Sequence, residues 1–141
     1  MQNKMKDRRV VQKERKKDPN HFCQPIAEYH NTEVCRMDRP GPGGAPHQYE
    51  VFTQPAEGEY GMSLCRIHFQ EGPIKENGVN GVQHEDLIEI LIDRLTHFQA
   101  GPHACDENAA ALMRLQDAKA HLVGRTTRRI AAGTEGTSEG N

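Results

Sequence analysis

The sequence predicts an α+β protein in which a small antiparallel β-sheet or hairpin precedes an antiparallel two-helix hairpin. Two stretches between residues 48 and 70 alternate polar and apolar side chains, which is typical of strands with one face in solvent. Two stretches between residues 84 and 132 repeat apolar residues every three or four positions, which indicates amphipathic helices. Because only 35% of the 141 residues are hydrophobic and the chain has no Trp, we expect a small core that oligomerisation would extend.

The first 46 residues are expected to lie outside the folded domain. Residues 1–20 carry eight Lys and Arg against three acidic residues, although the whole chain has a net charge of −2. We interpret this segment as a solvated, partly disordered basic arm, with nucleic-acid binding as the alternative. The stretch "RPGPGGAP" at 39–46 predicts a linker because Pro and Gly interrupt regular structure. The predicted organisation is an arm and linker over 1–46, a domain over 47–137 and a flexible tail over 138–141.

The predicted strands are "QYEVF", residues 48–52, and "MSLCRIHFQ", residues 62–70, joined by the turn-forming stretch "QPAEGEYG". In the second strand the predicted core-facing side is formed by Ser63, Cys65, Ile67 and Phe69. Three turn signals follow within residues 71–81, in "EGPIKENGVNG". Backbone amides freed by such turns can hold anions, so this stretch is a candidate surface for a second ligand, with rigid hairpin geometry as the alternative.

The predicted helices are "HEDLIEILIDRLTHFQ", residues 84–99, and a second helix of about 24 residues that begins at Cys105 or Asp106. Gly133 is a plausible stop for the second helix, because a glycine readily adopts the left-handed conformation that ends helices. The short connection between the two helices predicts that they run antiparallel.

Two arginines near the end of the second helix suggest an anion site. Arg125 and Arg129 are four residues apart, so they share a helix face, and paired guanidinium groups bind phosphate bidentately. The alternative is a solvated last turn, where the helix dipole favours cations. Exposed amides and hydroxyls at Gly136 and Thr137 could complete a phosphate site, or could simply belong to a helix cap and a frayed tail.

Two further side chains suit a nucleotide. Phe98 ends the first helix, and an aromatic ring can stack on a base. Asn108 begins the second helix, and its amide can pair with an adenine edge as donor and acceptor. The alternatives are a core position for Phe98 and a helix-capping role for Asn108.

Several function classes find no support in the sequence. The sequence contains no run of about 18 apolar residues, so no membrane-spanning helix is predicted. The basic N-terminus lacks the apolar region of a secretory signal. The four cysteines are far apart, which argues against a disulfide framework and fits a reducing cytoplasm. His21, Cys23, His30 and Cys35 have zinc-ligand chemistry but no common zinc spacing, so we expect no metal. Without a nucleophile–base pair or a cofactor motif, we expect no catalytic residues and no cofactor.

Five stretches between about Arg39 and Thr137 resemble the phage Thoeris anti-defence family of the first type: "RPGPGGA", "FQEGPIKENGVNGV", "DLIEILIDRLTHFQAGP", "ENAAALMRLQDAK" and "RTTRRIAAGTEGT". The helical hairpin also resembles that of anti-CBASS cyclic-nucleotide sponges. The sequence departs from the family at two positions, where Ala132 replaces an Arg and Thr134 replaces a Val.

The resemblance implies a phage sponge that is not an enzyme. Such a protein binds cyclic ADP-ribose isomers of Thoeris immunity in the cytoplasm of the infected bacterium, and some members also hold cyclic di- or trinucleotides of CBASS. It implies a homo-oligomer, from dimer to hexamer, with no membrane association. It also implies stacking by Phe98, an amide contact from Asn108 and phosphate contacts from Arg125 and Arg129. The alternative hypothesis is a small nucleic-acid-binding or adaptor protein that uses the basic arm.

Overall fold

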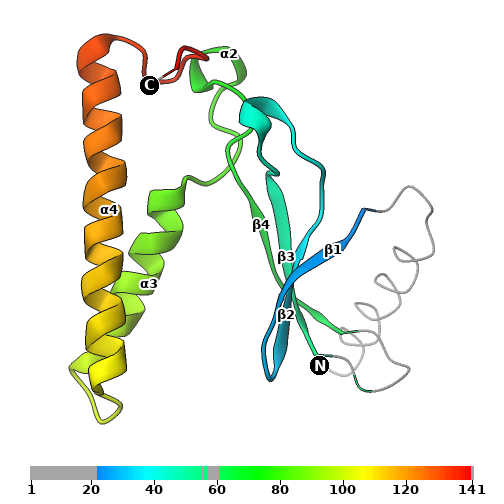
Figure 1. Ribbon diagram of the computed structural model, residues 1–141, viewed down its shortest axis with the longest axis vertical. Helices are drawn as coiled ribbons and strands as arrows, with labels where there is room; N and C mark the ends of the chain where they lie inside the picture. The colour runs from blue at the N-terminus through cyan, green and yellow to red at the C-terminus, as the bar shows by residue number, and fades with distance from the viewer. Residues whose placement is uncertain (1–21, 55, 57–60, 141) are drawn as a thin grey trace. The chain divides into compact units, whose positions relative to one another are not determined.

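The computed structural model describes residues 22–54, 56 and 61–140, which form a β-sheet and a set of helices (Figure 1). Contacts within the chain separate two compact units, Met1–Glu71 and Gly72–Asn141, and each is described by itself. The predicted class, an antiparallel sheet followed by a two-helix hairpin, is confirmed. The predicted domain of residues 47–137 includes parts of both units, and its limits stay a prediction.

The first unit contains one four-stranded sheet in which every neighbouring pair of strands is antiparallel. Its strands follow one another in space as they do along the chain: β1 (Gln24–Glu28), β2 (Thr32–Arg36), β3 (Gln48–Thr53) and β4 (Ser63–His68). The strands β3 and β4 fall where the alternating patterns predicted them. The sheet is therefore an up-and-down meander with β1 and β4 at its edges.

The strands β1 and β2 lie in the segment that the sequence had suggested was peripheral. Pro25 is part of β1, and the pairing of β1 with β2 shifts between Pro25 and Ala27. A proline has no N–H to donate, so it is tolerated on an edge strand beside such an irregularity. The proline and the polar ends of this five-residue strand hide it from a search for alternating patterns.

The Pro/Gly-rich stretch between β2 and β3 forms a closed loop. The carboxylate of Asp38 accepts hydrogen bonds from the backbone N–H of His47, at 3.1 and 3.0 Å, and of Gln48, at 3.0 Å. Within the loop, the short 3-10 turn Pro42–Gly44 includes Gly43 at a φ of 77°, which a glycine adopts without steric cost. The stretch therefore connects two adjacent strands instead of separating an arm from a domain.

The sheet buries few side chains. Cys35 and Phe52 are 2% and 4% exposed, and Glu50, 2% exposed, bonds the Nε of Arg66 at 2.9 Å. Burial raises the pKa of the Cys35 thiol well above its ordinary value. The predicted core-facing side of β4 is confirmed at Ile67, which is half-buried, and is wrong at Cys65, which is exposed.

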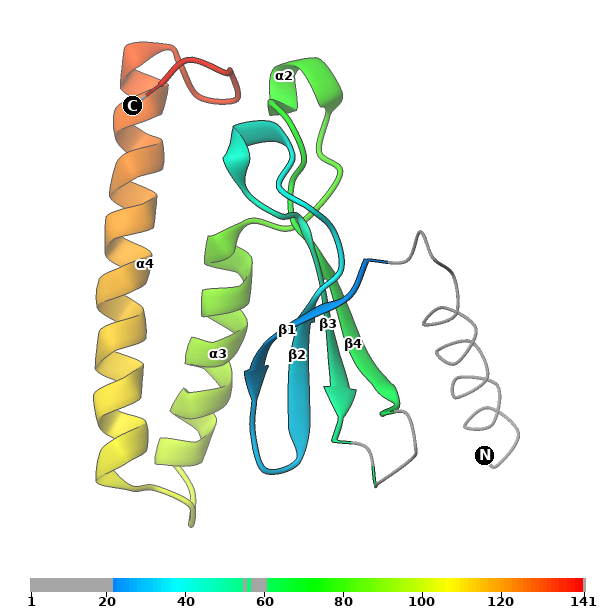
Figure 2. The same ribbon diagram turned by 45° about the vertical axis from the view of Figure 1, so that its right-hand side comes forward.

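The second unit contains α2 (Ile74–Asn77), α3 (His84–Gln99) and α4 (Asp106–Ala132). The helices α3 and α4 run antiparallel and side by side, as Figures 1 and 2 both show. Ile92 is the buried residue of α3, and Lys119 Nζ of α4 bonds Glu89 Oε2 of α3 at 2.8 Å. In the part of the chain that the structure describes, no helix has the length and apolar character needed to cross a bilayer.

The ends of both long helices are held by local hydrogen bonds. At the start of α3, the backbone N–H of Gln83 donates to Asp86 Oδ2 at 2.7 Å in a capping box. At its end, the Gln99 amide bonds both the N–H and the carbonyl of Cys105, at 3.0 and 3.1 Å. The helix α4 ends at Gly133, which has a φ of 73° as the sequence predicted for this position.

Candidate functional site

A cleft of about 310 Å³ lies in the helical unit, between the start of α3 and the last third of α4. Ile74 and Leu122 supply apolar walls, and Arg125 supplies a positive charge. Three carboxylates also line the cleft, those of Glu85, Asp86 and Glu135. Its volume is at the lower end of the range of about 300–1,000 Å³ that is usual for ligand sites. Apolar walls with a few charged or polar groups are the usual composition of a small-molecule site.

Arg125 is the cation of this cleft. It is exposed, and the structure gives its guanidinium no hydrogen bond or ion pair among the residues that it describes. Five N–H donors in a rigid fork are therefore available to a ligand that enters the cleft.

Arg129, one turn further along α4, has a different environment. It is 8% exposed, and all three of its guanidinium nitrogens donate to the loop that follows the helix. The acceptors are Glu135 Oε2 at 3.1 Å and three carbonyl oxygens, those of Thr134 at 2.7 Å, Thr137 at 3.2 Å and Glu139 at 2.9 Å. In this chain Arg129 is thus an internal anchor, and a contact from it to phosphate stays a prediction.

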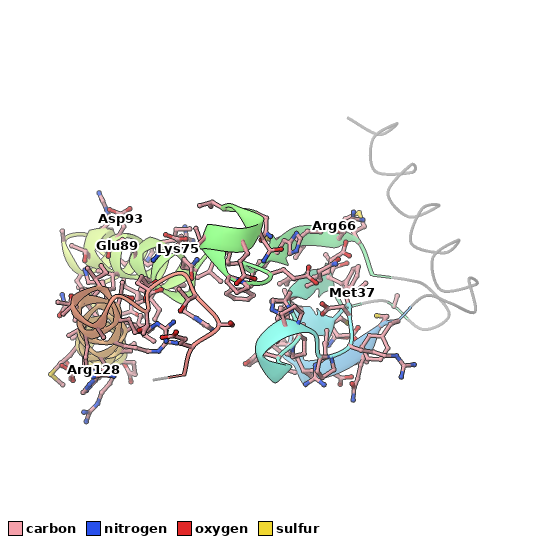
Figure 3. All side chains as sticks on the ribbon, turned by 90° about the horizontal axis from the view of Figure 1, so that it is seen from above. Met37, Arg66, Lys75, Glu89, Asp93 and Arg128 are labelled. Atoms are coloured by element: carbon pink, nitrogen blue, oxygen red, sulfur yellow. The ribbon has the colours of Figure 1, made fainter. Side chains whose placement is uncertain are left out.

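Arg128, the third cation at this end of α4, is exposed and points away from the other helix. Figure 3 shows it on the side of α4 opposite Glu89 and Asp93 of α3. The three arginines therefore have different environments: Arg125 lines the cleft, Arg128 faces solvent and Arg129 is buried.

The two other candidates near the C-terminus, Gly136 and Thr137, are engaged with the chain itself. Gly136 has a φ of 73°, and its carbonyl accepts a hydrogen bond from the N–H of Lys75 at 3.1 Å. Thr137 Oγ1 donates to the carbonyl of Thr134 at 2.6 Å. Residues 133–139, which we call the C-terminal loop, are thus folded around Arg129 and against α2.

Phe98 and Asn108 lie at the opposite end of the hairpin, beside the loop that joins α3 to α4. The half-buried Phe98 ring is edge-on to His103, with centroids 6.2 Å apart, and the Arg94 guanidinium lies 4.8 Å from its centre. Asn108 Nδ2 donates to the carbonyl of His103 at 3.3 Å. The residue that caps α4 is Cys105, whose Sγ accepts from the Asn108 N–H at 3.4 Å.

The predicted ligand residues therefore form two groups within one chain. Asn108 and Arg125 are separated by most of α4, roughly 26 Å at 1.5 Å per residue. One chain brings Arg125, Arg129 and the C-terminal loop together, and it brings Phe98 and Asn108 together at the other end. Within one chain the two groups thus lie at opposite ends of the hairpin.

Glu135 is the residue that sequence reasoning missed. It lines the cleft and bonds Arg129, and it stands between Thr134 and Gly136 in the "GTEGT" stretch. Of the suggested zinc set, His21 lies outside the described residues. Over residues 22–54, 56 and 61–140, no three His, Cys, Asp or Glu side chains are grouped to hold a metal.

Comparison with known proteins identifies the helical part of the chain. Residues 63–127 match the family model of the Acb2/Tad1 hairpin domain. The chain is also 43% identical over 81 residues to Thoeris anti-defense 1 of Bacillus phage SBSphiJ7. The chain is therefore similar to Thoeris anti-defense 1 over little more than half of its length, and residues 63–127 are similar to the Acb2/Tad1 hairpin domain. The alignment covers 57% of this chain and 57% of the relative, so the chain spans little more than half the length of the curated relative that it matches.

The Acb2/Tad1 hairpin match separates the candidate residues. It includes Phe98, Asn108 and Arg125, and it ends at residue 127, before Arg129 and the C-terminal loop. Arg125 therefore belongs to the matched hairpin, whereas Glu135, which lines the same cleft, lies beyond it.

Proposed function

We propose that this protein counters Thoeris immunity by binding cyclic ADP-ribose isomers and sequestering them without cleavage. The homology to a protein named Thoeris anti-defense 1 and the Acb2/Tad1 hairpin domain support the biological setting. The observation that carries the proposal is the Arg125 guanidinium in the cleft of the helical hairpin, which has no partner among the residues that the structure describes. In this proposal the protein acts in the cytoplasm of the infected bacterium and is not an enzyme.

The chemistry of the cleft suits a pyrophosphate. A guanidinium group binds phosphate oxygens through two parallel charge-assisted hydrogen bonds, which are about twice as strong as neutral ones. Leu122 and Ile74 line the same cleft as Arg125, and electrostatic attraction becomes stronger where a bound ligand displaces water.

The proposed site is completed by a neighbouring protomer. A cleft of about 310 Å³ is small for a whole dinucleotide-like ligand, and Phe98 lies at the far end of the hairpin. In a symmetric dimer whose two-fold axis is perpendicular to the hairpins, the two hairpins run antiparallel to each other. The loop end of one protomer can then approach the C-terminal end of the other. Phe98 would then stack on the base and Asn108 would pair with its edge, within a dimer or a larger assembly up to a hexamer.

A sponge acts by mass action. It must bind its signal tightly enough to lower the free concentration below the threshold of the effector, for which a nanomolar Kd, about −12 kcal/mol, is sufficient. Cyclic di- or trinucleotides of CBASS are a second ligand class in this proposal. The turn-rich residues 72–81, "GPIKENGVNG", which include α2, are the surface that we assign to them.

The decisive experiment is isothermal titration of the full chain with cyclic ADP-ribose isomers. We expect Arg125→Ala to weaken binding by roughly 100-fold, because a desolvated charged hydrogen bond contributes about 1.5–3 kcal/mol. Arg128→Ala removes the same charge from the exposed side of the same helix and serves as the matched control. Equal affinity in Arg125→Ala and Arg128→Ala would remove the support for this site.

Sequestration differs from turnover in what the protein releases. We expect heat denaturation of the loaded protein to return the intact cyclic ligand, as chromatography and mass spectrometry would show. Recovery of a linear or hydrolysed product would identify an enzyme and refute the sponge.

The rival proposal is a nucleic-acid-binding or adaptor protein, and it rests on the basic residues 1–20, which lie outside the described part of the chain. Deleting residues 1–20 separates the two proposals. Nucleic-acid binding would be lost with the arm, whereas binding of cyclic ADP-ribose isomers should persist.

A further inference from the structure

The C-terminal loop is ordered around one buried side chain. Arg129 is 8% exposed, and its guanidinium donates hydrogen bonds to three backbone carbonyls and one carboxylate of residues 134–139. A second attachment holds the loop against α2, where the Lys75 N–H donates to the Gly136 carbonyl at 3.1 Å. Such a loop has little freedom to move independently of α4, so its side chains occupy fixed positions.

Glu135 is the acidic side chain that this loop presents to the cleft. Its Oε2 accepts from Arg129 Nε at 3.1 Å, and its side chain is 36% exposed. Its Oε1 has no hydrogen-bond partner among the residues that the structure describes. The same cleft is lined by Arg125, so a bound molecule meets a guanidinium and a carboxylate together.

We propose that Glu135 is a specificity-determining residue whose carboxylate accepts hydrogen bonds from sugar hydroxyls of the ligand, and that Arg129 is the residue that positions it. This inference rests on the proposed function and extends it to the ribose of the ligand. A carboxylate can only accept hydrogen bonds, so it attracts hydroxyl groups and repels phosphate. Dinucleotide-binding folds use an Asp or Glu on a ribose hydroxyl in the same way.

Arg125 and the carboxylates of the cleft, Glu135 together with Glu85 and Asp86 at the start of α3, thus favour a ligand of a particular kind. A phosphate binds at Arg125, and a ribose with a free hydroxyl binds at Glu135. A more highly phosphorylated molecule would place a second anion against Glu135 and would be disfavoured. The bond from Arg129 keeps one carboxylate oxygen occupied, so that the other is directed at the ligand without loss of rotamer freedom on binding.

The test measures selectivity and uses cyclic ADP-ribose isomers alongside analogues that each lack one free ribose hydroxyl. We expect the wild-type chain to bind at least one analogue roughly tenfold more weakly than the parent, the loss that one charge-assisted hydrogen bond implies. In Glu135→Ala the ratio of the Kd for the analogue to the Kd for the parent should fall to near one. Glu135→Gln, which keeps the shape of the side chain, should reduce the preference and guards against an effect of loop unfolding in Glu135→Ala.

Arg129→Lys tests the positioning role. Lysine keeps the charge but lacks the planar fork, so it cannot hold four acceptors at once. We expect it to lose the preference between parent and analogue in the same way as Glu135→Ala, which a change in overall stability alone would not produce.

The outcomes separate this inference from the function on which it rests. If the wild-type chain binds parent and analogues equally, or if Glu135→Ala keeps the wild-type preference, the role of Glu135 is refuted while the sponge stands. If the wild-type chain binds neither parent nor analogues, the proposed function and this inference fall together.

Discussion

At the end of the hairpin where α3 meets α4, polar side chains bond across an exposed loop, whereas at the end where α4 stops, an arginine is buried in the chain that follows. Gln99 makes two hydrogen bonds and Asn108 makes one to backbone groups at this end, and all three lie at the surface. Arg129 donates to the Glu135 carboxylate and to three backbone carbonyls from a position that is 8% exposed. The two ends thus depend on their polar side chains to very different degrees.

The difference determines how a loss of binding can be interpreted at each end. A side chain with weak, exposed contacts can be removed with little effect on the fold, so a change in ligand affinity reports on the ligand. A buried side chain with many partners serves the fold, so its removal changes the site and the fold together. Arg125 and Arg129, which the sequence presents as an equivalent pair, fall into these two different categories.

The largest effect on stability is expected for Arg129→Ala. It leaves the carboxylate of Glu135 and three carbonyl groups without their donor, and we expect the free energy of unfolding to fall by roughly 2–3 kcal/mol. Urea unfolding measures this loss. Arg128→Ala, at an exposed position, should change stability by less than about 0.5 kcal/mol, and equal losses in the two variants would show that the buried network contributes nothing.

A smaller loss is expected for Gly136→Ala, in the loop that Arg129 holds. The φ of 73° costs an L-residue roughly 1–2 kcal/mol, and the added Cβ would lie 3.3 Å from Lys75 Cγ. Gly133→Ala is a matched control, because Gly133 has the same φ of 73° but nothing within 4 Å of the added Cβ. Thermal unfolding should show a greater loss for Gly136→Ala, and the reverse order would mean that the contact with α2 is absent.

The helices and the second half of the sheet could be predicted from the sequence, because local periodicity specifies them. The pattern of residues 84–99 coincides with α3, and the glycine expected to end α4 does so at Gly133. The strand β1 could not be predicted in this way, since Pro25 lies in an irregular edge strand that only its pairing with β2 stabilises. Local pattern carries no information about such pairing.

The candidate site was predictable in chemistry and only partly in geometry. Spacing places Arg125 and Arg129 on one face of a helix, but it does not reveal that the chain after Gly133 folds back onto one of them. That fold depends on the positive φ of Gly133 and Gly136, which returns the carbonyls of residues 134–139 to the guanidinium. Glu135 was missed for the same reason, because its place in the cleft follows from the path of the loop.

Asn108→Ala should separate binding from folding at the other end of the hairpin. Its side chain makes one exposed hydrogen bond, to the His103 carbonyl at 3.3 Å, so we expect a loss of stability of about 0.5–1 kcal/mol. If Asn108 pairs with the base, ligand affinity should fall by roughly tenfold or more. Titration measures the ligand affinity, and urea unfolding of the same preparation measures the stability. A loss of affinity no larger than that of Arg128→Ala would show that Asn108 is not part of the site.

The smallest effect is expected for the ion pair that links α3 to α4 at mid-length. Lys119 Nζ and Glu89 Oε2 are 2.8 Å apart, but the two side chains are 35% and 58% exposed. Water and salt screen such a pair, so Lys119→Ala should cost no more than about 0.5 kcal/mol, and less at high salt. A double-mutant cycle with Glu89→Ala isolates the coupling of the two charges. A coupling above about 1 kcal/mol that persists in 1 M salt would mean that the pair is shielded from solvent in the assembled protein, which would place this face of the hairpin against a second protomer.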